Sequence, residues 1–268
     1  VVRETAELFA SGFEELDDKR LAELLKHLDI RVRLRAQYTL AGRGEKSIAV
    51  LKEAARFSGN LFAQMHAIWG LGQLKAGTEL LPFLHDSNDE LRAQATRTLG
   101  NIGSRNAIED IRDLIADKSP RVRTFAAIAA GKLGDTAAIP ALLNMLKVNA
   151  DRDAFERHAA SFALSLLPLK IDAAEIPALS RSERLGVLLA LRRKLDPRIT
   201  LFLEDADPTL VNEAIRAIND LEIPEALPIL AEHTEAFAGD FSGSLPEEIM
   251  FRRIINVNFR MGTPESAG

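Results

Sequence analysis

A segment of about 30 residues recurs along this chain of 268 residues, and this repeat restricts the possible folds more than any other feature. The clearest copies are 29, 30 and 31 residues apart, and they begin at Val32, Leu61, Leu91 and Val122. In the first copy, Val32, Ala36 and Leu40 are spaced so that they share one face of a helix. The repeat therefore predicts a succession of amphipathic helices.

A second kind of amphipathic segment lies between the copies. These segments cover residues 48–55, 80–84, 107–115, 139–146, 199–203 and 226–231. Polar turns rich in Asp, Ser, Asn and Pro follow them and offer N-caps to the next helix. We expect helix ends at Gly100, Gly103, Gly131 and Gly134. The pattern indicates antiparallel helix pairs.

The copies continue into the second half of the chain in a less regular form. Copies begin at Leu210 and Met250, with weaker ones at Phe155 and near Leu185. Stacked helix pairs share one continuous core, because a single pair cannot bury its apolar face alone. We predict an all-α fold, an α-solenoid of HEAT-type helix pairs with about seven to eight repeats. The prediction is a single domain over residues 1–268, with a long loop at 235–246 before the last repeat.

Composition narrows the classes of partner. The chain has 34 Lys and Arg against 39 Asp and Glu, a net charge of −5, whereas nucleic-acid binding needs a basic stripe. It has no Cys, which excludes disulfides and thiolate ligands, and no apolar stretch long enough for a membrane span. We expect a protein partner, no nucleic acid and no membrane span.

Residue patterns for catalysis and metal binding are missing from the sequence. The five His are scattered, and none forms the His-Glu dipeptides that some helical-repeat enzymes use to hold iron. No glycine-rich phosphate loop or nucleophile elbow follows a strand pattern. We therefore predict no catalytic, cofactor-binding or metal-binding residue, and no enzymatic activity.

Asp and Arg recur at matching positions of three repeats. These ladder residues are Asp29, Arg33, Asp86, Arg92, Asp117 and Arg123. An acid-base site is one interpretation, and a series of turn Asp to helix Arg bonds that tie repeat to repeat is the other. Three copies favour the structural interpretation, because charge-assisted bonds of this kind are strong and catalysis does not need three.

The candidate interaction surface consists of the third, fourth and seventh positions of each copy, which helical geometry turns away from the core. Arg and Tyr are common at the energetic centres of protein interfaces. The predicted contact residues at these positions are Arg35, Tyr38, Gln64, Gln94, Arg97, Arg216, Arg252, Arg253 and Asn256, and Arg260 at the end of the last copy is added to them. In the second copy the same positions include Ala63 and Ala67. The alternative is an ordinary solvated helix face.

Four phrases are more specific than a general helical repeat. They stand in order as LLKHLDIRVRLRAQYTLAGRG (24–44), HAIWGLGQL (66–74), EAIRAINDLEIPEALPILA (213–231) and RRIINVNFRMGTPESA (252–267). Together they resemble the HEAT-repeat region of membrane-bound dehydrogenase-like proteins of planctomycetes and verrucomicrobia, with the weakest match at 151–196. In that family the region lies between a β-propeller and a c-type cytochrome domain.

The resemblance implies a location and a role. It implies a periplasmic or cell-surface protein, with haem c and a quinone or metal in the flanking domains. Haem attachment needs Cys, so no cofactor is expected in this segment. The chain is expected to be a fragment of a larger protein, since it begins with Val1 and no partner helix follows residues 251–261.

The expected function is a non-catalytic scaffold that positions the propeller and the cytochrome domain. A free-standing protein-binding solenoid is the alternative. A HEAT-like lyase or hydroxylase, and a nucleic-acid-binding repeat protein, are further alternatives that the sequence leaves open.

Overall fold

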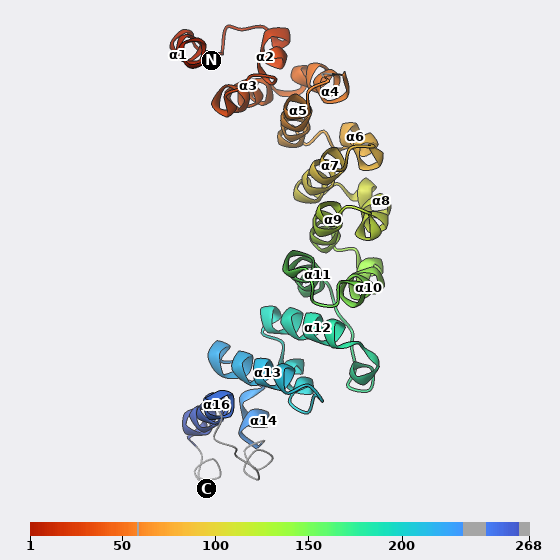
Figure 1. Ribbon diagram of the computed structural model, residues 1–268, viewed down its shortest axis with the longest axis vertical. Helices are drawn as coiled ribbons and strands as arrows, with labels where there is room; N and C mark the ends of the chain where they lie inside the picture. The colour runs from red at the N-terminus through yellow and green to blue at the C-terminus, as the bar shows by residue number, and fades with distance from the viewer. Residues whose placement is uncertain (58, 233–244, 263–268) are drawn as a thin grey trace. The chain divides into compact units, whose positions relative to one another are not determined.

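The computed structural model describes residues 1–57, 59–232 and 245–262, and these residues form helices and turns with no β-strand (Figure 1). The predicted all-α fold is confirmed. The chain groups into two compact units, Val1–Ala138 and Ile139–Gly268, where the sequence predicted one domain over 1–268. We call them unit 1 and unit 2 and describe each by itself.

Unit 1 has two layers of helices (Figure 1). Consecutive members of the inner layer pack on one another, and they are α3 (Ile30–Gly42), α5 (Leu61–Gln73), α7 (Asp89–Ile102) and α9 (Pro120–Leu133). The outer layer contains α2 (Asp18–Leu24), α4 (Ile48–Phe57), α6 (Gly77–Leu80) with the 3-10 helix η2 (Leu81–His85), and α8 (Ile108–Asp113) between η3 (Arg105–Ala107) and η4 (Leu114–Ala116). The remaining elements are α1 (Val2–Ser11), η1 (Gly44–Ser47) and η5 (Thr136–Ala138).

Unit 2 repeats the inner layer but has a thinner outer layer. Its inner helices are α11 (Ala154–Leu166), α12 (Arg181–Lys194), α13 (Pro208–Leu221) and α16 (Leu245–Met261). Among the described residues of unit 2, outer-layer α-helices stand only before α11 and α16, and they are α10 (Ile139–Asn149) and α14 (Leu227–Glu232). Before α12 and α13 stand the 3-10 helices η6 (Ile176–Ala178) and η7 (Pro197–Phe202). The degenerate copy near Leu185 is thus a regular inner helix that lacks an α-helical partner.

The last helix has partners that the sequence analysis did not expect. Helix α16 packs on α13 and α14, so helices earlier in the chain cover its buried residues Ile254 and Val257. Leu245 and Pro246 open this helix, so the predicted loop does not include them. Residues 235–244 of that loop lie outside the described residues.

The third residue of each inner helix of unit 1 is buried and sets the register of the repeat. These residues are Val32, Ala63, Leu91 and Val122. The copy that we placed at Leu61 therefore starts two residues too early, because Leu61 is an apolar but exposed residue in the first turn. Ala63 and Ala67, predicted on the outer surface of the helix, are fully buried instead.

Two glycines end helices and one allows two helices to approach closely. Gly103 and Gly134 adopt left-handed conformations with φ of 71° after α7 and α9, as predicted. Gly100 and Gly131 lie within the last turn of these helices, so the predicted ends there are wrong. A Cβ on Gly100 would lie 2.5 Å from the Ala129 Cβ, so glycine is needed where α7 crosses α9.

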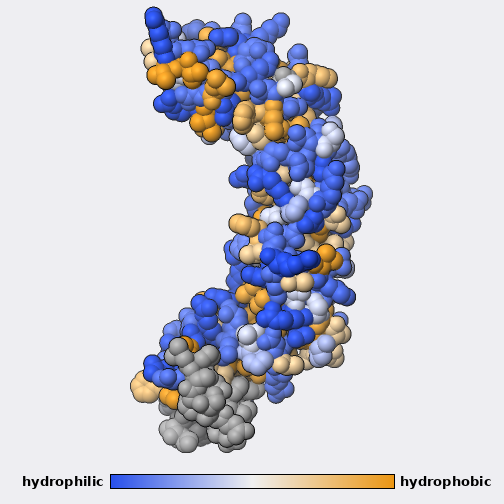
Figure 2. Space-filling model, in the orientation of Figure 1, coloured by the Kyte–Doolittle hydropathy of each residue, from blue (hydrophilic) through white to orange (hydrophobic). Residues whose placement is uncertain are grey.

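The exposed surface contains both hydrophilic and apolar side chains. The face shown in Figure 2 is mostly hydrophilic, and its apolar side chains form small separate clusters in both units. No helix of the described residues is long and apolar enough to cross a membrane.

Candidate functional site

The fourth residue of several inner helices bonds back to the turn before its own helix. Arg92 Nη1 donates to the Asp86 carbonyl at 2.8 Å, and Arg123 Nη1 donates to the Asp117 carbonyl at 2.7 Å. The predicted pairs therefore meet through the backbone oxygen of the Asp, not through its carboxylate. Gln64, the fourth residue of α5, instead donates its Nε2 to the Ala55 carbonyl in the last turn of α4, at 3.0 Å.

The tie between repeats is a separate bond from the same Arg to the next turn. The Nε and Nη2 atoms of Arg92 each donate at 2.9 Å to one carboxylate oxygen of Asp117, and the two side chains are 7% and 9% exposed. Asp117 Oδ1 also accepts the Ser119 N–H at 2.8 Å. Burial disfavours the charged carboxyl, but the bonds from Arg92 and Ser119 outweigh it and lower the pKa of Asp117.

Unit 2 contains the same arrangement. Arg184 donates its Nη1 to the Leu179 carbonyl at 3.0 Å, and its Nε and Nη2 reach the Asp205 carboxylate at 2.8 and 3.2 Å. Asp205 accepts the Asp207 N–H at 2.8 Å. These residues form a hydrogen-bond network within unit 2. The sequence did not single them out, because the copy predicted near Leu185 begins two residues after Glu183, the third residue of α12.

Between α3 and α5, the first two inner helices of unit 1, the Arg side chain binds a histidine where Arg92 binds an aspartate. Arg33 donates through Nη1 to the carbonyls of His27 and Leu28 at 2.7 and 3.0 Å, and its Nε lies 3.2 Å from His66 Nε2. His66 Nδ1 lies 2.7 Å from Gln37 Oε1. A neutral imidazole that accepts from Arg33 and donates to Gln37 satisfies both contacts. Burial, and then the Arg33 charge, lower the pKa of His66 to about 4.

Asp29, the predicted partner of Arg33, has a different role. Its carboxylate caps α3 by accepting the Arg31 N–H at 2.9 Å, and it also binds the Arg31 side chain. The side-chain bond from Arg31, followed by the backbone bond, holds the pKa of Asp29 well below its usual range. The pair predicted at this repeat is therefore absent as a side-chain bond.

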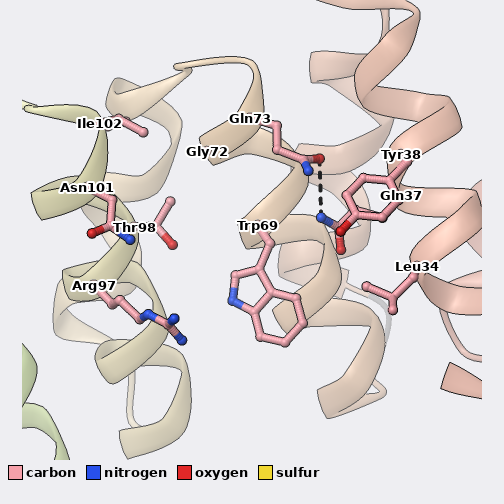
Figure 3. Close-up of a pocket in the computed structure, with 10 residues that line it drawn as sticks. All are labelled: Leu34, Gln37, Tyr38, Trp69, Gly72, Gln73, Arg97, Thr98, Asn101 and Ile102. Atoms are coloured by element: carbon pink, nitrogen blue, oxygen red, sulfur yellow. Dashed lines mark hydrogen bonds between the residues drawn. The ribbon is translucent and has the colours of Figure 1, made fainter. Parts of the chain in front are cut away.

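A hollow of about 450 Å³ lies on the inner helices of unit 1 (Figure 3). Tyr38, Trp69 and Arg97 line it, and each is the ninth residue of its own helix, α3, α5 or α7. Figure 3 shows Trp69 on the middle helix, with Leu34 and Tyr38 on one side and Arg97 and Thr98 on the other. The structure thus brings together Tyr38 and Arg97, which the sequence analysis named, and adds Trp69.

Buried polar contacts fix the indole of Trp69. Its Nε1 donates to Gln94 Oε1 at 2.9 Å, while Gln94 Nε2 donates to Glu90 Oε1 at 2.7 Å. The His66 ring meets the indole edge to face at 4.8 Å. Gln94 is only 2% exposed, so it supports the surface from beneath and is not the contact residue that we predicted. Gln64 is half-buried and held by its backbone bond.

Two cations beside the hollow differ in their partners. Arg97 is exposed, and its guanidinium stands 5.6 Å from the centre of the Phe125 ring. Among the described residues no carboxylate lies within ion-pair distance of Arg97. Arg35 is also exposed but is paired with Glu14 at 2.5 Å. Arg97 is therefore the cation most available to a ligand on this face.

The predicted contacts of unit 2 divide into two groups. Arg253 bonds to Asp220 at 3.3 Å and Arg260 donates to the Asn219 carbonyl at 2.9 Å, so both hold α16 against α13. Arg216 lies 3.6 Å from both Glu213 and Asp220. Two exposed residues complete the set: Asn256, and Arg252, which pairs with Glu248 one turn before it. The predicted surface is thus partly an internal contact.

Within the described parts of the chain, no group of three or more His, Cys, Asp or Glu side chains is arranged to hold a metal ion.

Known proteins that contain helical repeats are similar to this chain. Residues 77–165 match the family of HEAT repeats. YibA of Escherichia coli has a similar solved structure, with 20% identity, a TM-score of 0.50, and 94% of this chain and 84% of that chain covered. No curated protein matches the sequence. The HEAT-type α-solenoid predicted from the repeat is confirmed.

Two further solved structures are similar at lower scores. Human deoxyhypusine hydroxylase, in complex with glycerol, has 19% identity and a TM-score of 0.39, with 90% of this chain and 95% of that chain covered. A designed armadillo repeat protein in complex with the peptide (KR)4 has 18% identity and a TM-score of 0.35, with 90% and 99% covered.

Proposed function

We propose that this chain is a protein-binding scaffold whose contact surface in unit 1 is the hollow lined by Tyr38, Trp69 and Arg97. The observation that carries the proposal is the placement of a Tyr, a Trp and an Arg at the same position of three consecutive inner helices, where the Arg has no carboxylate partner among the described residues. Trp, Tyr and Arg are the residues most enriched among those that dominate protein interfaces.

The hydrogen bond from Trp69 to Gln94 supports this role. Because the indole is already fixed by Gln94 and His66, a ligand that stacks on it loses little side-chain entropy on binding. The amides of Gln73 and Asn101 line the same hollow and can bond to the backbone of an extended segment. The surface therefore suits an unstructured peptide segment of a partner protein.

A finer proposal concerns the partner. We infer that the segment bound is supplied by flanking domains of the same protein, a dehydrogenase-like β-propeller and a c-type cytochrome, at a periplasmic or cell-surface location. The support is the resemblance of four sequence phrases, in order, to the HEAT-repeat region of that family. Any haem, quinone or metal would then belong to the flanking domains, and this chain would fix their spacing.

A selection experiment tests protein binding. A displayed library of random peptides is selected against the chain, and the affinity of the selected peptides is measured by calorimetry. The double variant Tyr38→Ala/Arg97→Ala should weaken them about 30-fold, since two central contacts are lost. The matched control Phe57→Ala/Arg56→Ala removes an exposed aromatic and an exposed Arg of α4 and should leave the affinity unchanged. Equal loss in both variants would contradict the proposed surface.

The finer proposal has its own test. The full reading frame on both sides of this segment should encode a propeller before it and a Cys-x-x-Cys-His sequence after it. A frame without either removes the redox context and leaves the peptide-binding proposal standing.

A further inference from the structure

A second hollow lies within unit 2, on α11, α12 and α13. Its volume is about 600 Å³, in the range of small binding sites. Three arginines line it, Arg157, Arg192 and Arg193, together with the Phe162 ring. The hollow is therefore basic on a chain whose net charge is −5.

The three arginines differ in their interaction partners. Arg192 forms an ion pair with Glu213, and Arg157 lies 3.5 Å from Asp151. Arg193 is exposed, has no carboxylate within ion-pair distance among the described residues, and stands 4.6 Å from the centre of the Phe162 ring. One guanidinium is thus free for an anion and is already oriented by an aromatic face.

A buried hydroxyl without a partner lines the same hollow. Ser161 is 6% exposed, and its Oγ has no hydrogen-bond partner within the described residues. Ser165, one turn later in α11, donates instead to the Phe162 carbonyl at 2.7 Å. The Ser161 Oγ is itself covered by protein atoms, so this residue lies beneath the hollow and makes no direct bond to a ligand.

Apolar side chains border the basic part of the hollow. Leu195 and Leu221 both line it and are exposed to solvent. An anion alone would leave this apolar border uncovered, whereas an anionic group with a neighbouring apolar side chain would cover it.

We propose that this hollow binds a peptide segment in which an acidic side chain is next to a leucine-like side chain. The Arg193 guanidinium donates to the acidic group, and Leu195 and Leu221 receive the apolar one. A single unpaired cation suits one anionic side chain and not a nucleic-acid backbone, which needs a row of cations. The site is independent of the hollow in unit 1.

The test uses four blocked synthetic peptides and the whole chain. The first alternates Glu and Leu, the second has Gln for Glu, the third has Ser for Leu, and the fourth has phosphoserine for Glu. Calorimetry should show binding of the first and the fourth, and at least about tenfold weaker binding of the second and third. The ratio between the first and the fourth distinguishes a carboxylate from a phosphate ligand. Equal binding of the Glu and Gln peptides overturns the proposal.

Three variants locate the site. Arg193→Gln should weaken binding of the Glu peptide about tenfold, whereas Ser161→Ala, which changes a covered hydroxyl beneath the hollow, should leave that affinity unchanged. Lys147→Gln, on the exposed face of α10, removes the same charge outside the hollow and should change nothing. Circular dichroism checks that each variant is folded.

The fluorescence of Trp69, the single Trp of the chain, separates this site from the one in unit 1. It should stay unchanged as the Glu peptide binds. A peptide that binds equally to Arg193→Gln and the parent chain overturns the inference without affecting the proposed function.

Discussion

The packing of α7 on α9 in unit 1 and that of α12 on α13 in unit 2 share one hydrogen-bond arrangement, but they differ in the outer layer and in the helix ends. In both, an Arg donates through two nitrogens to an Asp of the following turn, Arg92 to Asp117 and Arg184 to Asp205. The outer layer differs, because α8 stands between the first two helices and only the 3-10 helix η7 stands between the second two.

The helix ends differ as well. Glycines follow α7 and α9, whereas Leu195 and Glu222 follow α12 and α13 in the same left-handed conformation. A side chain costs about 1 kcal/mol in that conformation relative to glycine. The repeat thus persists in unit 2 without two of its local supports, which indicates that the Arg–Asp bond and the buried face of the inner helix hold successive repeats in register.

The largest expected effect comes from breaking that shared bond. Asp117→Ala and Asp205→Ala each leave a nearly buried guanidinium without its carboxylate and a backbone N–H without its acceptor. Each should lower the free energy of unfolding by about 3 kcal/mol, measured by urea denaturation. If either variant loses less than about 1 kcal/mol, the bond does not hold the repeats together in that unit.

A smaller effect is expected in the pH dependence of the free energy of unfolding, which should differ between the two units. An unfolded His titrates near its ordinary pKa of about 6.5, whereas folded His66 titrates at about 4. Between these values the unfolded chain binds more protons, so stability falls as the pH is lowered from 6.5 to 4, by about 2–3 kcal/mol in total. This loss belongs to unit 1, where His66 lies between Arg33 and Gln37.

Urea denaturation at several pH values measures this loss. His66→Gln should flatten stability across that window, while His158→Gln, an exposed His of unit 2, should not. The lowered pKa values of Asp29 and Asp117 act in a separate window, because their contribution is present above about pH 4 and is lost only below it. An unchanged slope in His66→Gln would contradict the assignment.

The smallest expected effect is at the helix ends. Gly103→Ala should destabilise the chain by about 1 kcal/mol, because its φ is 71° and an added Cβ meets no atom within 4 Å, so only the backbone conformation is disturbed. Glu222→Gly, at φ of 52°, should stabilise it by up to about 1 kcal/mol. Thermal unfolding measures both shifts. If Gly103→Ala and Glu222→Gly both raise or both lower the stability, the helix ends of the two units do not differ in this way.

The periodic features of this fold were predictable from sequence, and the register was not. Spacing and turn composition predict the helix pairs, and Gly103 and Gly134 predict two helix ends. The register of α5 was lost because Leu61 is apolar but exposed, and with it the signal for Trp69, which aligns with Tyr38 and Arg97 only when Ala63 is taken as the first buried position.

The partners of polar side chains were also beyond the sequence. Nothing in the local pattern distinguishes Gln94, which is buried beneath an indole, from an exposed glutamine on a helix surface. Likewise, the sequence predicted a pair between Asp29 and Arg33, but in the structure the Asp29 carboxylate accepts a hydrogen bond from the Arg31 side chain. Such contacts depend on distances between repeats, which a repeat period does not provide.

The fluorescence of Trp69 tests the central claim most directly, because it is the single Trp and lies in the proposed peptide-binding hollow. A peptide selected against the chain should change the Trp69 emission in a saturable manner, with an affinity equal to that from calorimetry and weaker by about 30-fold in Tyr38→Ala/Arg97→Ala. Full binding by calorimetry with no change in emission, or with the same affinity in that variant, would contradict it.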